Sequence, residues 1–179
     1  AVATISDLNA KFAGGRVLGS GRAQIYYYKA PDLDFQFLVE NAKVQMPPIA
    51  YARVSGKIGL SGTALPYKLK GNFNISEALM RENFGSSDNA KALRTSKFFP
   101  QGSGGTTGEF ELIDMDIDIL AEKGLIIKND LFDGELKAAL KIIRSPKSPR
   151  ILGNVSILHG KLFFKDNFFS ISSGGLRFN

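Results

Sequence analysis

The chain has 179 residues, no cysteine, and a formal net charge of +6 from 23 Lys and Arg against 17 Asp and Glu. This length suits one domain with a sizeable core, and the lack of cysteine excludes disulfides, thiolate catalysis and cysteine-ligated metals. No run approaches the roughly 20 apolar residues that a membrane-spanning helix needs. The positive charge suits an anionic partner such as an acidic lipid surface, but it is too diffuse to select one.

The first part of the chain, up to Ile75, alternates apolar and polar residues. This period of two is typical of β-strands with one buried face and one wet face. Phe35, Phe37 and Val39, for example, fall on one face of an expected strand, and Gln36 falls on the other. The connections are too short for crossover helices, so the sequence predicts an antiparallel meander.

Residues 76–108 break this alternation. Ser76 offers a helix N-cap, and good helix formers follow it, so we expect a short helical excursion near residues 76–95. Residues 102–108, rich in Gly, Ser and Thr, predict a loop that leads back into strand. The whole insertion is expected over residues 77–108.

The alternation then resumes to the end of the chain. Met115, Ile117 and Ile119 share one face, and short strands with Gly, Asn and Asp turns follow. His159 and Gly160 are expected in one of these hairpin turns.

Part of the pattern occurs twice. Residues 34–40 return as 116–122, and residues 66–75 return as 149–157, with apolar residues on the same alternate positions. We therefore expect one amphipathic β unit in two copies, over about residues 34–76 and 116–160, within a single β domain.

Each expected strand has one apolar face, which needs a partner. Two arrangements remain open: two sheets packed as a closed β-sandwich, or one sheet folded along its length into an elongated trough with a hydrophobic interior. The repeat, and strand-like sequence at both ends, favour the trough as part of a longer array, with any anchor or targeting signal outside it. The expected lining of this groove is Phe35, Phe37, Val39, Ile58, Leu60, Leu69, Phe73, Ile75, Met115, Ile117, Ile119, Leu136, Leu140, Ile142, Val155, Ile157, Phe164 and Ile171.

Residue patterns for catalysis or metal binding are weak. Asp114, Asp116 and Asp118 resemble the opening of a calcium loop, but the Gly and the Glu that such a loop needs are missing. His159 is the one histidine, without a cysteine or a second histidine to complete a site. We therefore expect no enzyme, no cofactor, no metal and no nucleic-acid partner.

A basic cluster is expected at one hairpin tip. Lys141, Arg144, Lys147 and Arg150 lie close together in the sequence around two prolines. Such a tip is usually only solvated, but it could contact phosphate head groups or an acidic partner.

The ordered set of glycines and alternate apolar residues from Gly134 to Phe178 closely resembles the C-terminal repeat of TamB-like proteins, the translocation and assembly module proteins with the domain once called DUF490. Residues 56–75 look like a preceding copy, so the likeness covers most of the chain. The resemblance implies a periplasmic trough of strands with an apolar interior, sometimes called a β-taco. It also places this family near AsmA-like and bridge-like lipid transfer proteins.

The resemblance implies a protein anchored in the inner membrane of a Gram-negative bacterium, with a BamA-like outer-membrane partner of the TamA type. The expected function is to carry phospholipid acyl chains towards the outer membrane. The alternative is an interaction module that captures β-strands of unfolded outer-membrane clients, such as autotransporters, by β-augmentation. A closed sandwich used structurally or for carbohydrate binding is a third reading.

Overall fold

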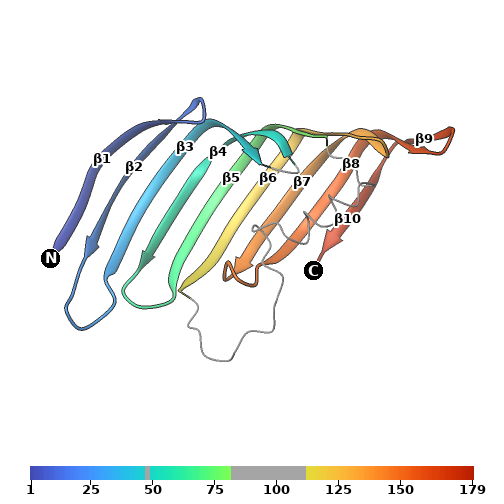
Figure 1. Ribbon diagram of the computed structural model, residues 1–179. Helices are drawn as coiled ribbons and strands as arrows, with labels where there is room; N and C mark the ends of the chain where they lie inside the picture. Colours follow the sequence, from blue (N-terminus) through green and yellow to red (C-terminus); the bar gives the residue numbers. More distant parts are fainter. Residues whose placement is uncertain (47–48, 82–111) are drawn as a thin grey trace.

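The computed structural model describes residues 1–46, 49–81 and 112–179. In this part of the chain ten strands form a single sheet, and there is no helix (Figure 1). The all-β prediction is therefore confirmed. In chain order the strands are β1 (Val2–Phe12), β2 (Gly15–Gln24), β3 (Asp32–Met46), β4 (Ile49–Gly62), β5 (Tyr67–Met80), β6 (Ile113–Lys128), β7 (Phe132–Arg144), β8 (Arg150–Phe164), β9 (Asn167–Ile171) and β10 (Gly174–Phe178).

The strands cross the sheet in nearly the order of the sequence. β1 to β8 follow one another, and the outer edge of β8 is then shared by β10 and β9, which pair with its first and second halves. Because all described strands belong to this one open sheet, a closed sandwich is wrong for the described residues. The apolar side chains of the described strands therefore project from a single sheet, with no second sheet to pack against.

One pairing departs from the predicted meander. All other neighbours are antiparallel, but β5 and β6 run parallel, with Tyr67 opposite Ile113 and Phe73 opposite Ile119. A parallel pair needs a connection of about a dozen residues or more, and residues 81–112 are long enough to supply it.

The predicted helix is wrong at its start. Ser76 to Met80 continue β5 instead of opening a helix, and the rest of the predicted excursion lies outside the described residues. On the polar face of this strand end, Glu77 accepts a hydrogen bond from the Tyr51 hydroxyl at 2.9 Å and lies 3.4 Å from Arg53 Nε. Pairing with β4 and β6 overrides the local helix propensity.

The turn predicted at His159 is also wrong. His159 and Gly160 lie inside β8, where His159 Nε2 is 3.2 Å from Glu135 Oε2 on β7. Glycines that look like turn residues in the sequence therefore lie within long strands here.

The pairing of β3, β4 and β5 recurs in β6, β7 and β8. Phe35 lies opposite Leu60 in the first group, and Ile117 lies opposite Ile142 at the matching positions of the second. In a group of three antiparallel strands, the first and the third strand run in the same direction. If a second group in the same orientation lies beside the first, its first strand must run parallel to the third strand of the first group. This is the relation between β6 and β5.

A row of irregularities bends the sheet across its strands. Bulges of this kind sharpen the local bend of a strand, and the strands in Figure 1 curve along their length. The register shifts lie between Val39 and Ala42 in β3, between Asn74 and Ala78 in β5, between Ala121 and Leu125 in β6, and between Ile157 and His159 in β8.

Candidate functional site

The structure places all eighteen predicted lining residues on one face of the sheet, here called the apolar face. Side chains directly opposite in paired strands project from the same side. Phe37 is paired with Ile58, and Phe73 with Ile119, which in turn is paired with Leu140. The same register carries this face on through β8, and through β9 and β10 beyond it.

Sequence reasoning missed the contribution of the N-terminal strand. Leu8 and Ala10 of β1 pair with Gly19 and Val17 of β2, and Gly19 pairs in turn with Phe37. The apolar face therefore begins at β1, earlier than predicted. Its signal was present as alternation in β1, which the register shift after Ile5 interrupts.

Several aromatic rings of the apolar face lie flat against a neighbouring strand. A Cβ added at Gly19 would stand 2.3 Å from the Phe37 ring, and one added at Gly21 would stand 2.2 Å from the Phe35 ring. These two rings are nearly parallel, with centroids 6.4 Å apart and planes 3° apart. Phe73 likewise lies over Gly56, where an added Cβ would be 2.6 Å from its ring. Because these glycines have no Cβ, the large rings can pack flat against the backbone of the neighbouring strand. The apolar face is therefore continuous from strand to strand.

Along the bend, the apolar face carries small side chains that are almost fully covered. Each of them is at most 6% exposed, although the described residues form only one layer. Ala52 pairs with Ala78, and Ala121 with Ala138, so they lie together inside the row of bulges. Their burial is expected on the inner side of a bend, where larger neighbours close over a methyl group. This crease consists of Ala42, Ala52, Ala78, Ala121 and Ala138.

No second layer covers the apolar face among the described residues. Most of its side chains are half-buried by their neighbours, and towards the C-terminus they become exposed, with Leu176 at 67%. An apolar surface continuous over ten strands is far larger than a soluble monomer usually leaves open. The apolar face is therefore a candidate binding surface for an apolar ligand.

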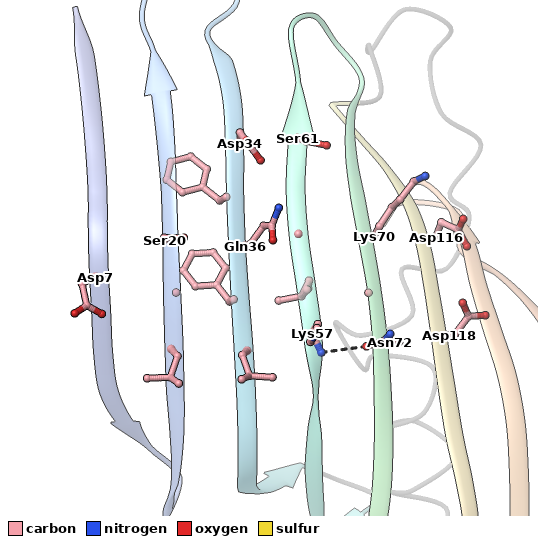
Figure 2. A pocket seen from close by; sticks show the side chains of 18 of the residues that line it. Asp7, Ser20, Asp34, Gln36, Lys57, Ser61, Lys70, Asn72, Asp116 and Asp118 are labelled. Atoms are coloured by element: carbon pink, nitrogen blue, oxygen red, sulfur yellow. Dashed lines mark hydrogen bonds between the residues drawn. The ribbon is translucent and has the colours of Figure 1, made fainter.

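The opposite face, here called the polar face, carries the charges. A depression of about 700 Å³ lies on it, bordered mostly, but not only, by polar residues from β1 to β6 (Figure 2). The Lys57 backbone N–H donates to Asn72 Oδ1 at 3.2 Å beside it. A second depression of about 550 Å³ on the same face is more apolar and includes Leu120 and Leu152. Most residues around both hollows belong to the polar face, but predicted lining residues border them too: Phe35, Phe37 and Ile58 the first, and Phe73, Ile119 and Leu140 the second. Among the described residues the apolar face itself is an open surface and not a closed pocket.

Asp116 and Asp118 of β6 lie on the polar face and are paired with a lysine, unlike the ligands of a calcium loop. Lys141 on β7 donates to Asp116 and lies 3.3 Å from Asp118 Oδ1. The hydrogen bond from Lys141 holds the pKa of Asp116 below its usual range, and the same bond raises the pKa of Lys141. No cluster of three or more potential metal ligands is found among the described residues.

The structure does not gather the predicted basic cluster into one patch. Lys141 lies within β7, on the polar face, where the aspartates hold it. Arg144 ends β7 opposite Met115 on the apolar-face register, and Lys147 lies in the turn before β8. Arg150 opens β8 opposite Ile143. Three of the four residues therefore lie near this turn, without a shared face.

Comparison with known proteins identifies the family of the chain. A model of the TamB C-terminal domain matches residues 6–179. No match was found among curated proteins or among solved structures. Since the match covers nearly the whole chain, this protein belongs to the TamB family through its C-terminal domain.

Proposed function

We propose that the apolar face binds the acyl chains of phospholipids and guides them across the strands, towards the outer membrane. The observation that carries this proposal is the continuity of the apolar face over ten strands with no covering layer among the described residues. The TamB family is a family of transport and assembly proteins without enzymatic activity, and in general it works with TamA. A BamA-like partner of the TamA type is accordingly part of the proposal.

The energetics support an apolar conduit. Transfer of a lipid tail into water costs about 0.8 kcal/mol per CH₂ group, so a 16-carbon tail meets a barrier on the order of 10 kcal/mol. Side chains such as Phe37, Ile117 and Leu140 offer the tail surroundings similar to a bilayer interior. The surface lowers the barrier but supplies no direction, so net transport needs a gradient or an energised partner.

The recurring register gives the conduit a way to lengthen. We propose that β3 to β5 and β6 to β8 are two copies of one three-stranded unit, which extend the same apolar face side by side. The matching pairs Phe35 with Leu60 and Ile117 with Ile142 support this reading. Each added unit would lengthen the path for a lipid tail without a change of cross-section.

We place this conduit in the periplasm, as part of a protein anchored in the inner membrane. The described part of the chain contains no helix that could span a bilayer. The proposed anchor would then belong to another part of the protein, as the family resemblance implies.

The proposal is tested by what the purified protein carries. Mass spectrometry of small molecules extracted from the protein should find phospholipid at a fixed ratio to the chain. An arginine at Phe73, in the middle of the apolar face, should lower that ratio, whereas an arginine at the neighbouring Asn72 on the polar face should not. Absence of lipid from both the parent and the Asn72→Arg protein would refute the proposal.

A second candidate is capture of a client β-strand by the edge of the sheet. It is favoured by the open sheet, in which β1 pairs with another described strand on one side only. An exposed edge of this kind can accept a strand by β-augmentation. Amide protection of β1 on addition of an unfolded outer-membrane protein, with no lipid bound to the apolar face, would favour this function over the conduit.

A further inference from the structure

The hairpin formed by the end of β8 and by β9 differs from the rest of the sheet. It turns at Lys165 and pairs Phe164 with Asn167 and Phe163 with Phe168. β7 begins only at Phe132, opposite Leu162, so the tip extends past the start of β7. Figure 1 shows this hairpin projecting from the end of the sheet.

The tip of this hairpin is aromatic on both faces. Phe164 and Phe169 continue the apolar face and are 60% and 56% exposed, whereas Phe168 lies on the other face and is 60% exposed. Elsewhere the second face is mostly polar, so ordinary strand amphipathicity does not account for Phe168. Exposed rings on both sides of a protruding hairpin indicate a surface that is covered when the protein works.

The charges beside these rings select the kind of surface. Lys161 Nζ lies 5.3 Å from the centre of the Phe168 ring, and Lys165 Nζ lies 5.7 Å from the centre of the Phe164 ring. Phenylalanines with lysines beside them are found in elements that lie on a membrane surface, where the rings enter the acyl boundary and the ammonium groups reach the phosphates. Asp166 at the turn opposes deep insertion, so the hairpin fits the head-group level.

We propose that the hairpin from Lys161 to Ile171 docks on the surface of a bilayer that contains anionic phospholipid. Its lysines complement the lipid phosphates, and its rings on both faces replace water by acyl chains over the area they cover. Since the apolar face runs out into this hairpin through Leu162 and Phe169, docking brings the end of that face to the lipid surface. The docking does not require lipid transport, and it holds even if the apolar face carries another cargo.

The absence of tryptophan from the chain makes docking measurable. Phe168→Trp introduces the sole tryptophan at the hairpin, and Leu120→Trp introduces it on the polar face of β6, at a leucine that is 41% exposed. With vesicles of equal parts phosphatidylethanolamine and phosphatidylglycerol, the Phe168→Trp fluorescence should shift to the blue and be quenched by brominated acyl chains. The Leu120→Trp fluorescence should show neither change.

Partition measurements give the size of the effect. Phe168→Ser should lower the vesicle partition coefficient roughly tenfold, since the loss of one buried ring is worth about that factor. Leu120→Ser should leave it unchanged, and replacement of phosphatidylglycerol by phosphatidylcholine should weaken binding. An unchanged partition coefficient in Phe168→Ser, or Phe168→Trp fluorescence that ignores these vesicles, would overturn the proposal and assign the hairpin to a protein partner. Ile119→Arg separates membrane docking by the hairpin from lipid carriage by the apolar face. This variant should lose lipid carriage and still bind vesicles.

Discussion

An arginine at Ile119 tests the apolar face at its centre. Ile119 lies on β6 between Phe73 of β5 and Leu140 of β7, all on the apolar face. A tail that crosses one strand spacing of about 4.8 Å leaves roughly four CH₂ groups over that strand, worth about 3 kcal/mol in all. If the charged side chain removes this contact, affinity for a lipid tail should fall about 100-fold.

The control for this change is the neighbouring position. Leu120 lies on the same strand, is 41% exposed, and projects from the polar face into the smaller depression. Binding of a phospholipid with a fluorescent acyl chain should therefore be weak in Ile119→Arg and close to the parent value in Leu120→Arg. Circular dichroism should show the same strand content in both proteins. Equal affinities in the two variants, or loss of binding only in Leu120→Arg, would refute the assignment of the ligand to the apolar face.

Three further changes test the structure beneath that face. Ala121→Leu places a larger side chain in the crease, where Ala121 is 0% exposed, and should lower the free energy of unfolding by about 1–3 kcal/mol. An unchanged midpoint of urea unfolding would contradict tight packing around Ala121. Gly56→Ala should lower the melting temperature, because its Cβ would stand 2.1 Å from the backbone oxygen of Asn72, and tolerance of alanine would show that β4 and β5 pair differently. Lys141→Met removes the hydrogen bond that lowers the pKa of Asp116. A carboxylate with a lowered pKa stabilises the folded chain at pH values above its ordinary pKa, and this stabilisation is lost as the pH falls and the carboxylate is protonated. The parent should thus melt higher than Lys141→Met at neutral pH, with the gap closing below about pH 4, and a gap independent of pH would contradict the pairing.

The sequence predicted which residues share a face more reliably than where strands begin and end. Alternation reports the side from which each residue projects, whatever strand it pairs with, so Phe35 and Ile171 could be assigned to one face without any knowledge of the topology. Gly160, in contrast, looks like a turn residue in the sequence but lies inside β8. Only the neighbouring strand explains it, because the Phe132 ring and the Asp133 backbone oxygen of β7 come close to the space a Cβ would take.

The parallel pair and the false helix have the same cause, which is pairing with strands distant in the sequence. Ser76 is a typical N-cap residue followed by good helix formers, but it lies at a register shift where β5 bends between β4 and β6. Nothing local to Ser76 reports those neighbours. The crease was missed for a similar reason, since Ala121 and Ala138 become informative only when the register brings them together.

Site-specific photo-crosslinking along β5 tests the central claim most directly. A photoreactive amino acid placed in turn at Leu69, Lys70, Asn72 and Phe73 samples both faces of one central strand. In cells, Leu69 and Phe73 on the apolar face should crosslink to phospholipid acyl chains, whereas Lys70 and Asn72 on the polar face should not. Crosslinks of equal yield at all four positions, or only at Lys70 and Asn72, would contradict an apolar face that carries lipid.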